Sequence, residues 1–135
     1  MKALLILAAG ALSAGAAAPG PVPLQALTEA DVGANALASS ACYVHSGSAV
    51  LVVATRKNAV VNSDGDLLML DRSGSRGFPG GGARYRGNHL EVVIVPGEAA
   101  TAADGGRTDR AAQVSVATDG DTRSMTARWS CASPT

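Results

Sequence analysis

The chain has 135 residues, with eleven basic and eleven acidic side chains and a formal net charge of zero. This balance gives no electrostatic reason to expect nucleic acid or an anionic membrane as the partner, so we expect no nucleic-acid partner. Hydrophobic residues make up 47% of the chain and aromatic residues only 3%, and the length suits one domain of ordinary size.

The N-terminal stretch has the layout of a secretory signal peptide. Met1 and Lys2 give a positive start, an uncharged apolar run covers 3–12, and small residues follow at 13–20. The apolar run is shorter than the ~20 residues of a membrane-spanning helix, which disfavours the alternative of a transmembrane anchor. We therefore expect a signal peptide at 1–18 and an exported protein, periplasmic or secreted, with no membrane span.

Residues 19–40 are predicted to form a linker and one short helix. The prolines that bound the run 19–23 favour an extended chain. Thr28 and Asp31 form the Thr-x-x-Asp pattern of a helix start. Gly33 lowers the helix propensity by up to about 1 kcal/mol relative to alanine. The apolar residues expected along one side of this helix are Leu24, Leu27, Val32 and Leu37.

Beyond this helix, short β-branched and alternating runs bounded by turn residues predict β-strands. The strands are expected at 49–55, 59–62, 67–70, 83–86, 90–95, 113–117 and 124–131. Asp64-Gly65, Gly87-Asn88 and Asp119-Gly120 are the predicted hairpin turns. Two stretches, 72–82 and 101–109, lack strand signals and are predicted to be loops.

The last strand shows the alternation most clearly, because every second side chain from Met125 to Cys131 is apolar or a cysteine. No helix of the length found in βαβ units separates the predicted strands, which makes a parallel sheet unfavourable. Six to eight short strands over residues 41–135 predict an all-β fold, a small antiparallel β-barrel or sandwich.

Cys42 and Cys131 are the only two cysteines. In an oxidising compartment an even count favours a disulfide, and only one intramolecular pairing exists. Such a bridge closes a loop of about 90 residues, which stabilises the fold by at most about 4.5 kcal/mol in the chain-entropy model. The alternative is a pair of reactive or metal-binding thiols. His45 follows Cys42 closely, but there is no Cys-x-x-Cys motif.

Few residues suggest catalysis. His45 and His89 are the only histidines, and no Gly-x-Ser-x-Gly motif is present. The aspartates that flank Gly65 and Gly120 fit the backbone bonding of turns better than paired acid–base chemistry. The glycines at 80–82 precede a strand, whereas a phosphate cradle precedes a helix. We expect no enzyme activity, no metal site and no cofactor.

Several landmarks follow one another along residues 41–131. They are a first cysteine, an Asp-Gly-x-Leu-Leu-x-Leu hairpin, the tetrapeptide Gly-Ala-Arg-Tyr after a loop of small residues, a Gly-Glu-Ala turn and a closing cysteine. The chain in this respect resembles the membrane-bound and periplasmic inhibitors of C-type lysozyme, which implies a small exported antiparallel barrel. The matching residues are Cys42, Asp64, Leu67, Leu68, Leu70, Gly82, Ala83, Arg84, Tyr85, Gly97, Glu98, Ala99 and Cys131.

The resemblance also implies a binding edge and a partner, a C-type lysozyme. In that family a serine just before Gly-Ala-Arg-Tyr and a lysine before the later glycine reach the acidic catalytic cleft. Here Gly81 and Pro96 occupy these positions. A guanidinium binds a carboxylate through two hydrogen bonds, so Arg84 or Arg86 could replace the lysine. The expected binding residues are Gly81, Gly82, Ala83, Arg84, Tyr85 and Arg86.

Two functions follow from this reading. The first is a non-enzymatic inhibitor, a monomer or weak dimer, that inserts the loop 72–86 into a muramidase cleft. The second is a periplasmic structural or small-ligand-binding β domain in which the loops only cap the barrel. In the second case Arg84 lies on the barrel surface, while Tyr85 packs its ring and bonds its hydroxyl internally.

Overall fold

The computed structural model describes residues 18–19, 22–36, 41–74, 77–97, 101–102 and 107–132. The predicted signal peptide lies outside these residues except for Ala18, as do Leu37, Glu98 and Ala99. The elements are β1 (Ala18–Pro19), α1 (Glu29–Ala36), β2 (Cys42–Ser46), β3 (Ala49–Ala54), β4 (Asn58–Ser63), β5 (Asp66–Ser73), the 3-10 turn η2 (Pro79–Gly81), β6 (Ala83–Gly87), β7 (Leu90–Pro96), β8 (Thr101–Ala102), β9 (Arg107–Thr118) and β10 (Asp121–Ala132). Among these residues, no helix has the length and apolar character needed to cross a membrane.

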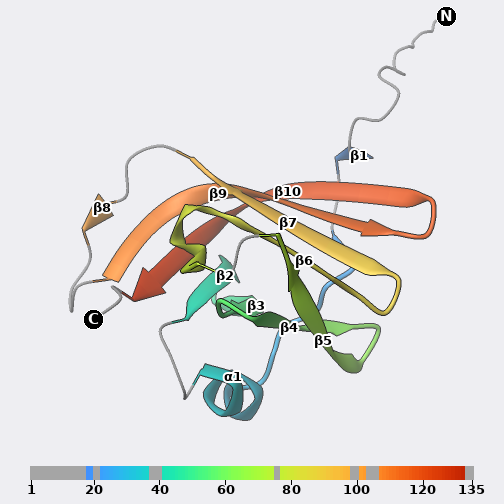
Figure 1. Cartoon of the computed structure of the whole chain (residues 1–135), viewed down its shortest axis with the longest axis horizontal. Helices are drawn as coiled ribbons and strands as arrows, with labels where there is room; N and C mark the ends of the chain where they lie inside the picture. The colour runs from blue at the N-terminus through green and yellow to red at the C-terminus, as the bar shows by residue number, and fades with distance from the viewer. Residues whose placement is uncertain are drawn as a thin grey trace, which may run out of the picture.

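Eight of the strands form one closed antiparallel barrel (Figure 1). Each strand from β2 to β7 pairs with the next along the chain, β7 pairs with β9, and β9 pairs with β10. β10 then closes the ring by pairing with β2, where Trp129 lies opposite Val44. The prediction of an all-β fold with six to eight strands is confirmed, and the architecture is a barrel.

The barrel interior is filled by the apolar side chains that alternate along each strand. On β7, Val92 and Ile94 are fully buried, whereas Val95 is 58% exposed on the outer face. The two largest buried side chains are Trp129 on β10 and Tyr85 on β6. Burial of this apolar surface is the main term that stabilises the barrel, at roughly 25 cal/mol for each Å² removed from water.

A disulfide joins the first and last strands of the barrel. Cys42 and Cys131 lie directly opposite each other in the β2–β10 ladder, with their Cα atoms 4.1 Å apart and an S–S bond between them. The predicted bridge is therefore confirmed, and it joins residues 89 positions apart in the sequence. A bridged pair of this kind is compatible with an exported protein.

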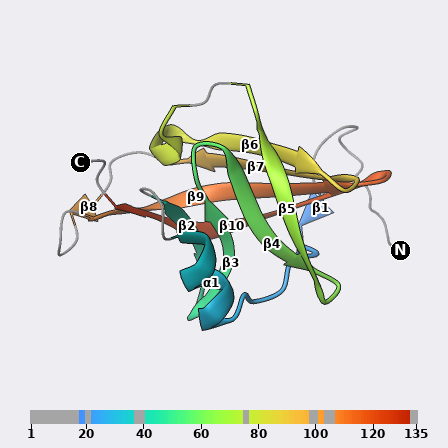
Figure 2. The same ribbon diagram turned by 60° about the horizontal axis from the view of Figure 1, so that its bottom comes forward.

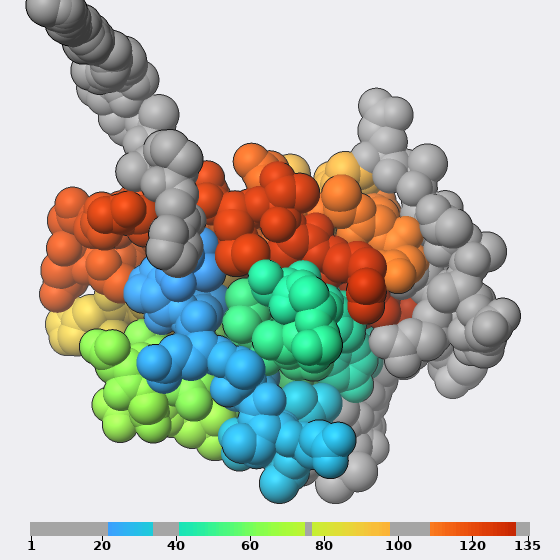
Figure 3. Space-filling model, turned by 180° about the vertical axis from the view of Figure 1, so that it is seen from behind, coloured from blue at the N-terminus to red at the C-terminus, as the bar shows by residue number. Residues whose placement is uncertain are grey.

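The N-terminal segment 22–27 is part of the barrel rather than a free linker; we call it the wedge segment. The N–H of Gln25 donates to the carbonyl of Asn62 on β4, and the N–H of Leu27 donates to the carbonyl of Val50 on β3, both at 2.8 Å. The segment thus fills the gap where β3 and β4 separate, and Val22 and Leu24 enter the core. Seen from behind, it lies between the end of the chain in red and the β4–β5 hairpin in green (Figure 3).

The short helix α1 lies outside the barrel, against β3 (Figure 2). Its predicted start is confirmed, because the Thr28 hydroxyl accepts from the Asp31 N–H at 3.1 Å and the Asp31 carboxylate accepts from the Thr28 N–H at 3.3 Å. Leu27 and Val32 pack on the outer face of β3 and β4, around Val53 and Val60. Leu24, expected on the same side of the helix, instead lies in the main core.

The two predicted loops, 72–82 and 101–109, are shorter in the structure, because strands extend into both. β5 continues to Ser73, with Arg72 opposite Tyr85 in the ladder. The predicted loop 101–109 contains β8 and the first residues of β9, where Asp109 lies opposite Ser130. Both extensions carry polar side chains, so they lack the apolar alternation by which a strand is recognised. They are strands nevertheless, because strands pair through the backbone. The carboxylate of Asp109 also lies 3.2 Å from the guanidinium of Arg128 on the neighbouring strand.

The predicted turns at Asp64-Gly65 and Asp119-Gly120 are confirmed by the pairs that flank them. The third turn lies one residue later than predicted. Gly87 pairs with Leu90, so Asn88 and His89 form the turn, with φ angles of 53° and 61°. Two successive positive φ angles are typical of the type I′ turn that matches the twist of a hairpin.

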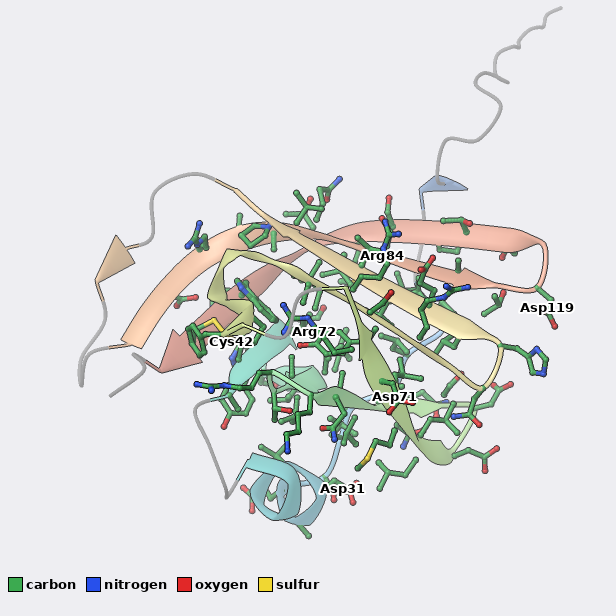
Figure 4. The ribbon with its side chains drawn as sticks, in the orientation of Figure 1. Asp31, Cys42, Asp71, Arg72, Arg84 and Asp119 are labelled. Atoms are coloured by element: carbon green, nitrogen blue, oxygen red, sulfur yellow. A yellow bond between two sulfur atoms is a disulfide. The ribbon has the colours of Figure 1, made fainter. Side chains whose placement is uncertain are left out.

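The alternating strand directions give the barrel two different ends. The disulfide end holds Cys42, the turn 55–57 and residues 77–82, whereas the turn end holds the four short hairpin turns. Figure 4 shows Cys42 and Asp119 at these opposite ends. The predicted binding edge begins at the disulfide end.

Candidate functional site

The glycine loop, residues 77–82, crosses the disulfide end between β5 and β6. Phe78 packs against the core and Pro79 is buried, so the loop is fixed at its start. The Gly82 N–H donates to the Pro79 carbonyl at 2.8 Å and closes the turn η2. The indole N–H of Trp129 donates to the carbonyl of Gly80 at 3.0 Å. The core thus holds this loop from below.

Gly82 and Gly81 differ in whether a side chain could replace the glycine hydrogen. Gly82 has a φ of 111°, and a Cβ there would lie 2.8 Å from the carbonyl oxygen of Ile94 and 2.9 Å from Cδ of Pro96. Only glycine meets both demands without strain. Gly81 is exposed and has nothing within 4 Å of a Cβ position. The tip of the loop therefore has room for a side chain, although its base does not.

Arg72 connects the glycine loop to the neighbouring turn. Its Nη1 donates to the carbonyl of Gly77 at 2.8 Å and to the carbonyl of Arg56 at 3.3 Å. Its guanidinium carbon lies 5.7 Å from the centre of the Tyr85 ring, within the range of a cation–π contact. Its backbone N–H donates to the carbonyl of Lys57 at 2.8 Å. One inward-facing arginine thus binds both loops of the disulfide end.

Tyr85 lies inside the barrel, fully shielded from solvent. Its hydroxyl donates to the carbonyl of Thr55 at 2.6 Å. Burial raises the pKa of Tyr85 from 10.0 to about 12, and the nearby charge of Arg72 partly opposes this shift. The side chain supports the turn at Thr55 from within, so Tyr85 positions the site rather than offering a contact surface.

Arg84 and Arg86 extend from the outer face of β6. Their side chains are 57% and 69% exposed, and Nε of each lies 3.6 Å from the same carboxylate oxygen of Glu91 on β7. Pairs this exposed contribute little to stability, in the range of about 0–1 kcal/mol. Two guanidinium groups share this carboxylate, and Asp71 lies opposite Arg86 in the β5–β6 ladder.

The six residues predicted for the binding edge therefore divide into three groups. Gly81 lies exposed at the rim; Arg84 and Arg86 are exposed on the outer wall; Gly82, Ala83 and Tyr85 shape and support the loop. Tyr85 adopts the internal packing and bonding that was the alternative expectation for this residue.

Three contributors to this end were not identified from the sequence. Arg72 was assigned to a loop, and the turn at Arg56-Lys57 was only the interval between the strands predicted at 49–55 and 59–62. Trp129 was placed on the buried face, but its bond to the glycine loop has no sequence signal because it joins residues 49 positions apart. A charge at an inward position of β5 is the one pattern that could have indicated Arg72.

A separate groove of about 590 Å³ runs along the outer wall between β5 and the turn end of β6, β7 and β9. Charged groups line much of it, and the His89 Nδ1 lies 3.9 Å from an Asp119 carboxylate oxygen. Its charged lining residues are Asp71, Arg72, Arg86, His89, Glu91 and Asp119. The described part of the chain contains no group of three or more His, Cys, Asp or Glu side chains arranged to hold a metal ion.

Comparison of the chain with protein-family models, with curated proteins and with solved structures gives no significant match. The likeness to the inhibitors of C-type lysozyme rests on the residues of the chain itself.

Proposed function

We propose that this chain is an exported, non-enzymatic binding protein that inhibits a C-type lysozyme by placing its disulfide end over the catalytic cleft. The observation that carries the proposal is the glycine loop, which Trp129 and Arg72 hold rigidly at the rim while Gly81 remains exposed. A loop that is already ordered loses little conformational freedom when it enters a cleft, so more of the contact energy appears as affinity.

The filled interior supports binding at the rim. Trp129, Tyr85 and Leu70 are all fully buried at the centre of the barrel. A ligand inside would have to displace these side chains, at a cost of several kcal/mol for each large apolar group that loses its packing. Recognition by the outer loops demands no such rearrangement.

The positive charges on the outer face of β6 support the proposal of an acidic partner. Arg84 and Arg86 share Glu91, and Asp71 lies opposite Arg86, so Arg84 is the guanidinium that is left to bind a carboxylate of the partner. A guanidinium binds a carboxylate through two parallel hydrogen bonds, and in a cleft that excludes water this pairing is stronger than at an open surface. Arg84 is the better placed of the two, because β6 begins at Ala83, directly after the glycine loop.

The test is the turnover of a C-type lysozyme in the presence of the purified exported protein. We expect turnover to fall with increasing protein, and Arg84→Ala to weaken inhibition more than Arg128→Ala does. Arg128 is a matched control because it is similarly exposed and is paired with Asp109 on β9. Full turnover at a large molar excess of the wild-type protein would end the proposal.

A gain-of-function variant sharpens this test. Gly81→Ser adds a hydroxyl at the rim where a side chain has room, and Pro96→Lys adds a cation on the strand beside it. The double variant restores the side chains found at these positions in the lysozyme inhibitors. We expect it to inhibit more strongly than the wild-type chain, with an unchanged melting temperature as the check on folding.

The outer groove favours a second candidate function, the binding of a small polar ligand. Its volume of about 590 Å³ lies within the usual range for ligand sites, and it offers both Arg86 and Glu91 for hydrogen bonds. Thermal-shift screening with small charged solutes tests this candidate. A stabilisation that Arg86→Ala abolishes and Arg128→Ala retains would support it over inhibition.

A further inference from the structure

We propose that the turn 55–58, here called the cationic turn, is a second contact for an acidic protein partner at the disulfide end. Its Arg56 and Lys57 side chains would bind carboxylates that the glycine loop cannot reach, because that loop has no charge in its described residues. The inference rests on the proposed function, since it takes the cleft of a C-type lysozyme as the partner.

The cationic turn is rigid by its own hydrogen bonds. The Thr55 N–H donates to the Asn58 carbonyl at 2.8 Å. The Thr55 hydroxyl accepts from the N–H groups of Lys57 and Asn58, both at 3.2 Å, and lies 3.1 Å from the Asn58 carbonyl. Four backbone groups are thus satisfied within one tight turn, which fixes the directions in which the two cationic side chains leave the backbone.

The barrel core anchors the same turn from below. The buried hydroxyl of Tyr85 donates to the Thr55 carbonyl, and the backbone N–H of Arg72 donates to the Lys57 carbonyl. The Arg72 guanidinium binds the carbonyl of Arg56 and that of Gly77 together. The cationic turn and the glycine loop are therefore held by one side chain and form a single preorganised surface.

Arg56 and Lys57 are the available charges of this surface. Both residues are exposed, and none of the ion pairs among the described residues includes either of them. Arg123 and Arg128, by contrast, pair with carboxylates at 3.1 and 3.2 Å. Asp71 lies opposite Asn58 in the β4–β5 ladder but forms no ion pair with the turn.

The charges of the described residues are divided between the two ends of the barrel. The turn end carries Asp64, Asp66, Asp119 and Asp121, with Arg123 paired to Asp121. The disulfide end carries Arg56, Lys57 and Arg110, besides the paired Arg128 and Asp109. The excess of aspartates at one end and of cations at the other gives the barrel a dipole, which orients the disulfide end toward an acidic surface. Complementary charges of this kind raise the association rate and fix the orientation of the complex.

The experiment measures the affinity and the association rate of the exported protein for a C-type lysozyme. We expect R56A/K57A to bind about tenfold more weakly or worse, with a slower association rate and a weaker dependence on salt. R56K/K57R keeps both charges and should retain affinity within about twofold. R123A/R128A removes the same net charge from cations that are already paired, and should also change affinity by less than about twofold.

The outcomes separate the two proposals. Wild-type binding that R56A/K57A retains in full, with both variants folded by their melting temperatures, overturns the role of the cationic turn and leaves the proposed function standing. An equal loss in R56A/K57A and R123A/R128A also overturns it, because net charge alone would then explain the effect. No binding by the wild-type protein overturns both proposals.

Discussion

Tyr85 shows how one side chain supports the binding end from inside. Removing its hydroxyl in Tyr85→Phe leaves the partly buried carbonyl of Thr55 without this donor, which should lower the free energy of unfolding by about 1–2 kcal/mol at neutral pH. The measurement is urea unfolding of both proteins. An unchanged midpoint would show that the bond to Thr55 contributes nothing to the fold.

The same residue predicts how stability depends on alkaline pH. Its pKa is raised to about 12 in the folded chain, whereas the ordinary value is 10.0. Below pH 10 both states keep the proton, so nothing changes; above pH 10 the unfolded chain releases it first, and stability falls by up to roughly 2–3 kcal/mol by pH 12. The difference between wild type and Tyr85→Phe should therefore shrink between pH 10 and 12. A constant difference over this range would contradict the burial of the phenol.

Two neighbouring glycines provide a matched test of the loop geometry. Gly82→Ala should destabilise the protein by about 1–3 kcal/mol, since its φ is 111° and a Cβ meets the Ile94 carbonyl at 2.8 Å. Gly81→Ala should stay within about 0.5 kcal/mol of wild type, because nothing lies near the added methyl group. Thermal melts of both variants measure the difference, and equal melting temperatures would contradict the described path of the loop.

The roles of single residues could be predicted from the sequence only where a local pattern indicates them. The cysteine pair and the capping residues Thr28 and Asp31 could be predicted, because a count or a short spacing defines them. Arg72 and Trp129 could not, because each acts across the barrel on a partner far away in the chain. Barrel closure creates those contacts, and no spacing along the chain encodes them.

At the scale of elements, the wedge segment completes the barrel where β3 and β4 separate. Leu24→Ala should cost about 2–4 kcal/mol, because the side chain is buried in the main core. Leu67→Ala, the same change at a residue 50% exposed on β5, should cost less than about 1 kcal/mol. Denaturant unfolding compares the two. Equal losses would show that the wedge segment does not pack as described.

The strands themselves were predictable because side-chain alternation records burial. The hairpin at Asp64-Gly65 and the run from Met125 to Cys131 both match the structure. The start of β9 and the wedge segment were missed, since both depend on backbone pairing with other parts of the chain. Alternation is a local signal of burial, whereas such pairing appears only once the ring has closed.

For the whole molecule, the disulfide is the covalent closure of the ring. C42A/C131A removes a link between residues 89 positions apart and should lower the free energy of unfolding by about 2–4 kcal/mol. For a domain of this size the melting temperature should fall by about 8–16 °C. Scanning calorimetry of this variant and of the reduced wild-type protein measures the loss. A melt that is unchanged in both would contradict the role of the seam.

The division of charge and the rigidity of the disulfide end both support the proposal that this end of the barrel is the docking surface. Amide hydrogen exchange with and without a C-type lysozyme tests it most directly, because it reports which loops become protected. The structure predicts slower exchange at 55–58 and 77–84, with no change at the turns 64–65 and 119–120. Protection confined to those two turns, or no protection anywhere, would contradict it.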